Sequence, residues 1–137
     1  MKNAILEVSA MMKVREGKLQ GFKQQAAEII RLAKERDTKT LRYDWFLSKD
    51  GTECEVREAY ESSEGLIEHR IHIVEALKKL FNEFAEDHAV KIYGDLSPQL
   101  TEILNGLKDV NIKRYSFLQG FEFQATSELA SPESINR

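Results

Sequence analysis

The 137-residue chain contains a single cysteine, Cys54, so no disulfide can form within it. A lone thiol is typical of proteins from a reducing compartment. The residues around Cys54 include no feature that would activate a thiolate, so we interpret it as a buried strand residue. Together these points predict a cytoplasmic protein.

The sequence also lacks long apolar runs, basic clusters and glycine-rich loops. No apolar stretch is long enough to cross a bilayer, and Glu7, Ser9 and Lys13 interrupt the N-terminal segment where a signal peptide would be continuous. The net charge is −3 and the Lys and Arg residues form no stripe, which argues against nucleic-acid binding. Without a phosphate-binding loop we expect no nucleotide, and we predict no cofactor and no membrane partner.

Hydrophobic periodicity predicts a single α+β domain over residues 1–124. Residues 4–14 alternate as a strand does, residues 18–36 carry an apolar helical stripe, and Asp50-Gly51 is typical of a hairpin turn. The expected elements are strand 4–14, helix 18–36, strands 40–48 and 52–60, helix 62–85, strand 88–96, helix 97–104 and strand 112–124. This order is that of a ferredoxin-like split βαβ fold with an antiparallel sheet. We expect residues 125–137 to form a mobile tail.

The arrangement also predicts a homodimer. Two long helices cover only one face of the sheet, and an uncovered apolar face usually marks an interface. Apolar residues predicted on that face are Ile5, Met11, Phe46 and Ala59. A monomer stays open as an alternative, because Glu7, Lys13, Arg42 and Arg57 are predicted on the same face.

Several segments resemble one known family. They are residues 14–18 with Phe22, residues 41–45, residues 56–60 followed by Glu64, Leu66 and His69, and residues 91–94. On these segments the chain is similar to the antibiotic biosynthesis monooxygenase family of the dimeric α/β-barrel superfamily, which includes quinol monooxygenase-like proteins. The resemblance implies a dimeric α/β barrel. It leaves the activity open, since members include cofactor-independent oxygenases, haem-degrading enzymes and proteins with no demonstrated reaction.

His69 and Glu58 are the candidate catalytic residues. His69 lies between Leu66 and Ile73 on the apolar stripe of the second long helix, where it could act as a general base. Strand parity and the family pattern together suggest Glu58 as the carboxylate that orients it. The alternatives are a core histidine with a satisfied hydrogen bond and a purely structural pair.

Tyr43, Trp45 and Tyr60 are the candidate substrate-binding residues. Aromatic walls suit a planar phenol- or quinol-like ligand, although large aromatic residues also simply fill cores. His72 and His88 have no partners at metal-ligand spacing, so we predict no metal site.

Three functions remain open at this stage. The first is cofactor-independent oxygenation of a small aromatic substrate, with His69 as base and Glu58 as its orienting partner. The second is a non-catalytic dimer that binds a small ligand or serves as an interaction module. The third, haem degradation, is disfavoured, because that branch of the superfamily relies on an Asn on the first strand and this chain offers only Asn3 before it.

Overall fold

The computed structural model describes residues 5–121, which form five strands and three helices. The elements are β1 (Leu6–Val14), α1 (Leu19–Arg36), β2 (Thr40–Leu47), β3 (Glu53–Tyr60), α2 (Ser63–Glu83), β4 (Ala85–Tyr93), α3 (Pro98–Asn105) and β5 (Asn111–Tyr115). Their order confirms the predicted α+β ferredoxin-like fold. The predicted tail at 125–137 lies outside the described residues.

The strands form one sheet in the order β2-β3-β1-β4-β5. Every neighbouring pair is antiparallel except β4 and β5, which run parallel. The sheet is therefore mixed: the four strands of the ferredoxin-like core are antiparallel, as predicted, and β5 is added at the edge parallel to β4. The reason is that α3 carries the chain back along the sheet between β4 and β5, as a parallel connection requires.

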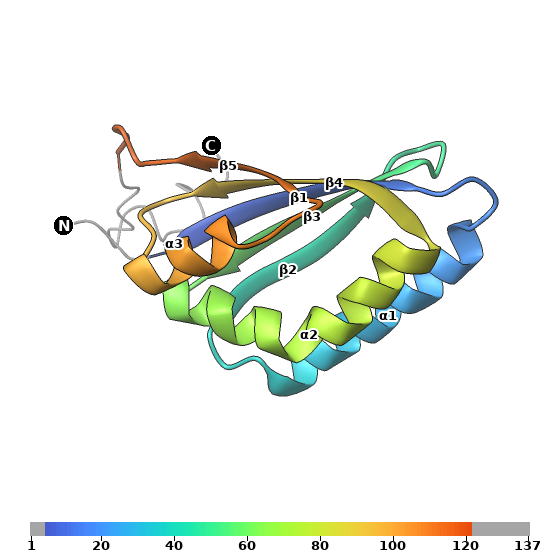
Figure 1. Ribbon diagram of the computed structural model, residues 1–137, viewed down its shortest axis with the longest axis horizontal. Coiled ribbons are helices and arrows are strands. Elements are labelled where there is room, and N and C mark those ends of the chain that lie inside the picture. Colours follow the sequence, from blue (N-terminus) through green and yellow to red (C-terminus); the bar gives the residue numbers. More distant parts are fainter. Residues whose placement is uncertain (1–4, 122–137) are drawn as a thin grey trace, which may run out of the picture.

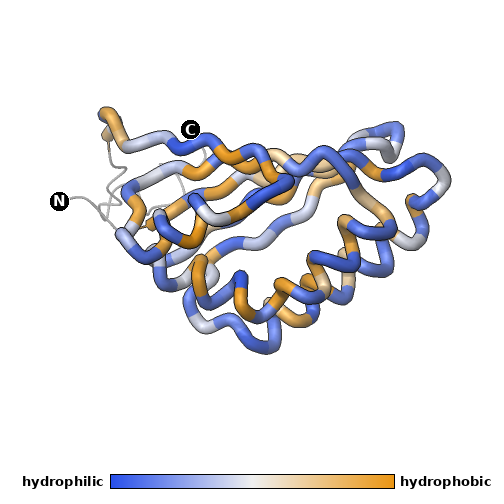
Figure 2. The backbone as a smooth tube through the Cα atoms, in the orientation of Figure 1, coloured by the Kyte–Doolittle hydropathy of each residue, from blue (hydrophilic) through white to orange (hydrophobic). Residues whose placement is uncertain are grey.

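All three helices lie on one side of the sheet, with α3 beneath the end formed by β4 and β5 (Figure 1). Orange and blue segments alternate along the strands and along α1 and α2 in Figure 2, which is the pattern expected of elements with one buried side. On α1 that side is formed by Phe22, Gln25, Ala26, Ile29 and Ala33. Serine caps begin the other two helices: Ser62 accepts from the Gly65 amide and Ser97 from the Leu100 amide.

Arg15 fixes the C-terminal end of α2 against the sheet. Its guanidinium donates to the carbonyls of Phe81 at 2.8 Å and Ala85 at 2.9 Å, and its backbone N–H donates to Phe84 at 2.8 Å. The chain therefore turns directly from α2 into β4, which begins at Ala85 and not at residue 88 as predicted. The alternation that marks a strand is broken there, since Asp87 has a φ of +59° and the β1–β4 register shifts between Met11 and Lys13.

The last strand is much shorter than the predicted 112–124. It ends at Tyr115, where it pairs with Tyr93, the final residue of β4. Beyond this point β4 has turned away at Gly94, so within residues 5–121 no strand continues the ladder. Residues 116–121 are not a strand, and the rest of the predicted element lies outside the described residues.

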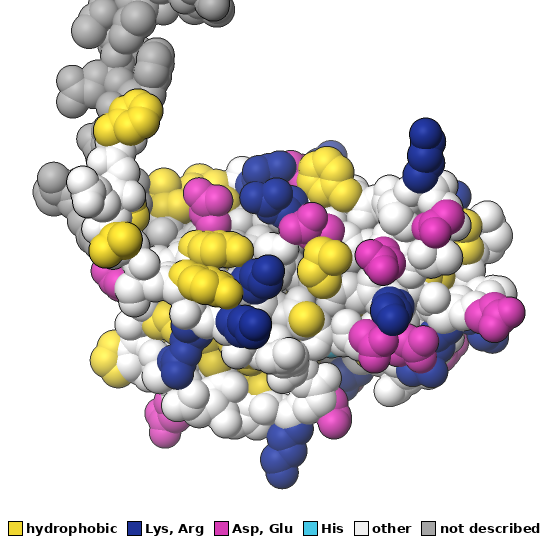
Figure 3. All heavy atoms as spheres, turned by 90° about the horizontal axis from the view of Figure 1, so that it is seen from above, with side chains coloured by type: hydrophobic (Ala, Val, Ile, Leu, Met, Phe, Trp, Pro, Cys, Tyr) yellow, Lys and Arg dark blue, Asp and Glu magenta, His cyan; other side chains and the backbone are white. Residues whose placement is uncertain are grey.

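The uncovered face of the sheet mixes apolar and charged side chains (Figure 3). Phe46 is 50% exposed there, and Tyr93 stacks on Tyr115 with ring centroids 5.3 Å apart. Charged residues intervene, including the Arg42–Asp44 pair at 2.8 Å. The homodimer stays a prediction. In the described part of the chain, no helix is both long enough and apolar enough to cross a membrane.

Candidate functional site

A cavity of about 620 Å³ lies between the inner face of the sheet and helices α2 and α3. Buried apolar residues form two clusters, and the cavity is lined by members of both, among them Val8 and Ile92 from one and Ala10 and Val56 from the other. His69, Glu58, Tyr43 and Trp45 also line it. Its size and mainly apolar walls suit a small organic molecule.

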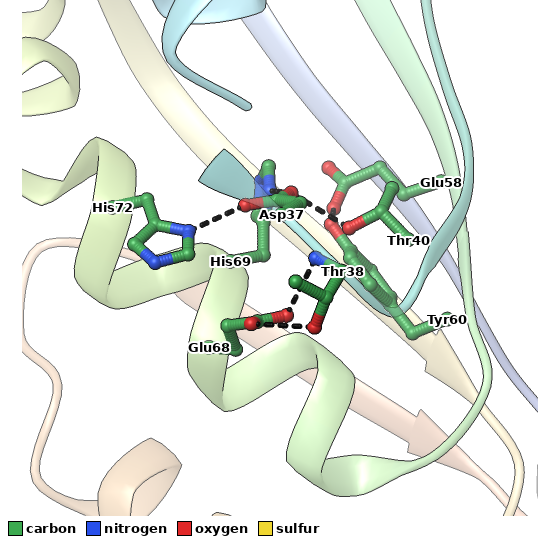
Figure 4. A network of polar contacts seen from close by, with 8 residues as sticks. All are labelled: Asp37, Thr38, Thr40, Glu58, Tyr60, Glu68, His69 and His72. Carbon is green, nitrogen blue, oxygen red and sulfur yellow. Dashed lines mark hydrogen bonds and ion pairs between the residues drawn. The ribbon is translucent and has the colours of Figure 1, made fainter. Parts of the chain in front are cut away.

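The carboxylate of Asp37 is hydrogen-bonded to two histidines of α2 (Figure 4). Its Oδ2 lies 2.6 Å from Nδ1 of His69, and its Oδ1 lies 2.7 Å from Nδ1 of His72. Thr40 donates its hydroxyl to the same carboxylate at 2.6 Å. The side chain of Asp37 is only 3% exposed, so these three hydrogen bonds compensate for its loss of water.

The segment that carries Asp37 is itself tied to α2. Asp37 follows the last residue of α1, and the next residue, Thr38, donates its backbone N–H and its hydroxyl to Glu68 at 3.0 and 2.8 Å. Glu68 and His69 are neighbours on α2, so the carboxylate and the imidazole are positioned by the same helix. The geometry of the Asp37–His69 pair is therefore held from both sides.

The electrostatics of this pair favour a neutral imidazole beside an ionised carboxylate. Burial alone would raise the pKa of Asp37, but hydrogen bonds from His72, Thr40 and His69 hold that pKa below its usual value. Burial lowers the pKa of His69, and the attraction of Asp37 offsets this only in part. Because the carboxylate accepts a hydrogen bond, Nδ1 of His69 carries the proton. Nε2 is then the nitrogen that is able to accept one.

Glu58 is a second ionisable group at the cavity, and it differs from His69 in being able to donate a proton. It lines the cavity from β3, and Tyr60 donates its hydroxyl to Oε1 at 2.5 Å. Burial raises the pKa of Glu58 to about 7, although the hydrogen bond from Tyr60 lowers it. Near neutral pH a large share of Glu58 is therefore a neutral acid that is able to donate a proton.

Aromatic rings surround His69. The Tyr43 ring meets it edge-on with centroids 4.5 Å apart, and the Tyr60 ring lies 5.3 Å away. Trp45 packs edge-on against Tyr43 at 6.0 Å. Tyr43 and Trp45 thus extend an aromatic wall from the histidine along β2.

The predicted site residues are brought together, but two of their roles change. Glu58 does not orient His69: Asp37 bonds the imidazole, and Glu58 bonds Tyr60, its neighbour two residues along the same strand face. Tyr60 is fully buried at 0% exposure and lies behind Glu58, so its ring does not form the wall expected for substrate. Tyr43 and Trp45 line the cavity at the predicted positions.

Sequence reasoning missed Asp37 and His72. Asp37 ends a helix 32 residues before His69, where an acidic residue looks like an ordinary surface residue. The one usable signal is the spacing of His69 and His72, three residues apart on a helix and so on neighbouring positions that a single carboxylate can reach.

Two further observations concern metal ligands and the thiol of Cys54. Within residues 5–121, no group of three or more His, Cys, Asp or Glu side chains is arranged to hold a metal ion. Cys54 is buried, and burial raises the pKa of its thiol to about 11, so it is unreactive as a nucleophile near neutral pH.

Known structures share this fold. MupZ from Pseudomonas fluorescens has a TM-score of 0.72 at 21% identity, over 90% of this chain and 92% of MupZ. A protein named putative antibiotic biosynthesis monooxygenase from Nitrosomonas europaea has a TM-score of 0.61 at 21% identity, over 72% of this chain and 96% of its own. Rv0793 from Mycobacterium tuberculosis has a TM-score of 0.59 at 22% identity, over 68% and 96%. No protein-family model and no curated protein matches the sequence.

The fold and the cavity therefore define an α+β protein of the ferredoxin-like class with a candidate site on the helical side of its sheet. Within that class its architecture is the one found in proteins named antibiotic biosynthesis monooxygenases, as the resemblance in the sequence predicted. At these identities the likeness concerns the fold.

Proposed function

We propose that this protein is an enzyme that performs general acid–base chemistry on a small, largely apolar substrate bound in the cavity. The observation that carries the proposal is that one cavity is lined by two groups of opposite kind: His69, kept neutral and oriented by Asp37, and Glu58, whose raised pKa leaves a large share of it protonated. Titratable groups whose environments drive their pKa values apart mark an acid and a base. His69 is the proposed base, Glu58 the proposed acid and Asp37 the positioning residue.

The reaction we propose is cofactor-independent oxygenation of a phenol- or quinol-like substrate, in line with the names of the proteins that share the fold. Nε2 of His69 takes the phenol proton, and the resulting electron-rich ring carbon forms a C–O bond with dioxygen. The peroxide anion takes the proton back from His69 and becomes a hydroperoxide. His69 then removes the proton on that carbon, which breaks the O–O bond and leaves a quinone carbonyl. The departing hydroxide takes a proton from Glu58 and leaves as water, and the proton held by His69 restores Glu58. Tyr43 and Trp45 provide the aromatic wall against which the ring packs.

Oxygen consumption tests this reaction. With a panel of hydroquinones and naphthols, the wild-type protein should consume one dioxygen for each quinone formed. The variants His69→Ala and Asp37→Asn should lose about a hundredfold or more of kcat/KM, because general base catalysis contributes about 10²–10⁴. Glu53→Gln, on the outer face of β3, is the matched control. Turnover that survives in His69→Ala refutes the proposed mechanism.

The pH profile provides an independent check on the roles. Activity needs His69 neutral and Glu58 protonated, so kcat/KM should fall below the lowered pKa of His69 and again above about pH 7, where Glu58 ionises. Glu58→Gln should remove the fall on the alkaline side, because its amide does not titrate. An unchanged alkaline limb in this variant would contradict the assignment of Glu58 as the acid.

The protonated state of Glu58 also favours a second candidate, a proton-transfer reaction such as an isomerisation that consumes no oxygen. An acid and a base that line one cavity are sufficient for such a step. Turnover under nitrogen distinguishes this candidate from oxygenation. Ligand binding with no turnover in either atmosphere would instead favour the binding module considered from the sequence. Asn3, on which the haem hypothesis depends, lies outside the described residues.

A further inference from the structure

Arg70 is a half-buried cation on the wall of the cavity. It follows His69 on α2, and its neighbours on the same cavity-lining stripe are the apolar residues Val74, Leu77 and Phe81. Among residues 5–121 its guanidinium has neither a hydrogen bond nor an ion pair. This guanidinium lies beside apolar surface with water as its partner, so an anion that enters the cavity is able to displace that water and pair with it.

The other cations that line the cavity differ from Arg70. Arg15 lies 3.8 Å from Glu86 and also binds two backbone carbonyls, and Lys78 lies 3.4 Å from Glu75. Lys108 is exposed at the rim, where the equally exposed Asp109 follows it. Arg70 is therefore the cation of the wall that combines partial burial with the lack of a carboxylate partner.

The surroundings of Arg70 place it apart from the acid–base pair. The charge of Arg70 acts on His88 of β4, while His69 contacts Tyr43 of β2. His88 packs flat on Phe81 with ring centroids 4.2 Å apart. Burial lowers the pKa of His88 to about 4, with Arg70 adding to the effect, so His88 stays neutral and does not compete for an anion. Glu58 lies on β3, and β1 separates β3 from β4, a span of about 10 Å at about 4.8 Å per strand.

We propose that Arg70 binds an anionic group of the substrate, a carboxylate, and holds it at the β4 side of the cavity while the reacting end lies at His69 and Glu58. This inference rests on the proposed function in taking the cavity as the substrate site. The substrate is then an apolar acid long enough to reach across the cavity. The planar guanidinium fork matches a carboxylate with two parallel hydrogen bonds, which a lysine does not reproduce.

Binding of matched acid and amide probes tests the proposal without any need for turnover. The pairs are 6-hydroxy-2-naphthoic acid with its carboxamide, and decanoic acid with decanamide, measured by isothermal titration calorimetry near neutral pH. Each pair has nearly the same shape and differs in charge. Wild-type protein should bind at least one acid about tenfold more tightly than its amide, the size expected for a charge-assisted pair.

The variants assign this preference to Arg70. In Arg70→Gln the acid should bind no better than the amide, while the affinity for the amide, which reports an intact cavity, stays unchanged. Arg70→Lys should keep part of the preference. Lys78→Gln, with the same loss of charge on the same helix, should keep all of it.

Two results overturn the proposal: no acid preferred over its amide by the wild type, or a preference that survives in Arg70→Gln. Because these are binding measurements, they are independent of the oxygen-uptake experiments. A carboxylate site in a protein that shows no turnover would refute the acid–base function and leave the role of Arg70 standing.

Discussion

Glu58 makes the stability of the fold depend on pH in the sense opposite to that of an ordinary carboxylate. In the unfolded chain it loses its proton near pH 4.5, and in the folded protein burial raises the pKa to about 7. Between these values the folded state binds more protons, so stability falls as pH rises and the loss is complete above about pH 7. The raised pKa corresponds to a loss of about 3 kcal/mol in the free energy of unfolding. Because Glu58 lines the cavity and solvent screens it there, we expect a loss of about 2 kcal/mol.

Glu58→Gln isolates this effect. The amide keeps an oxygen that accepts from Tyr60 but cannot ionise, so the variant should gain about 2 kcal/mol relative to the wild type between about pH 5 and about pH 8. Urea unfolding, followed by the fluorescence of Trp45, the sole tryptophan, measures both proteins at each pH. Comparing variant with wild type cancels the contributions of the histidines.

The control is Glu53→Gln, an exposed carboxylate on the same strand. Its stability should stay parallel to that of the wild type across this range. Parallel curves for Glu58→Gln as well would mean that Glu58 titrates like a solvent-exposed residue, and the reasoning that makes it an acid would fail.

Three further variants test other parts of the structure. Arg15→Met removes two hydrogen bonds that hold the end of α2 and should cost about 1–3 kcal/mol in urea unfolding; an unchanged midpoint would contradict this. As pH falls from about 6.5 to about 4, the free energy of unfolding of the wild type should decrease, because His88 binds a proton in the unfolded chain but has a pKa of about 4 when buried in the fold. His88→Gln should lose about 2 kcal/mol less than the wild type over this range, as urea unfolding at each pH would show. Gly94→Ala should cost about 1–3 kcal/mol, since φ is +129° and a Cβ would lie 2.7 Å from Leu6; a wild-type melting temperature would refute the strain.

The element order was predictable because it rests on local signals. Alternating apolar residues mark β1, Asp50-Gly51 marks the hairpin between β2 and β3, and Ser97-Pro98 marks the start of α3. The errors arose where the pairing with another strand determines the end of an element. β4 begins in a segment whose alternation is interrupted at Asp87, and β5 stops where its partner strand β4 ends.

The candidate site was predictable only in part, for a related reason. The position of His69 on an apolar stripe showed that it points inward, and strand parity placed Glu58 on the same side of the sheet. The hydrogen-bond partners were not predictable, since the bond between His69 and Asp37 joins a helix to the end of another helix 32 residues earlier. Arg70 was missed because an arginine on an amphipathic helix normally extends to water.

The carboxylate of Asp37 also links a buried imidazole to an imidazole that solvent reaches. His69, whose side chain is 4% exposed, and His72, which is 22% exposed, share that one group. Burial does most to lower the pKa of His69, and positive charge on His72 lowers it further. Positive charge on the outer side of this carboxylate therefore opposes protonation of the inner imidazole, so acidification should silence this site over a wider pH interval than one isolated imidazole would give.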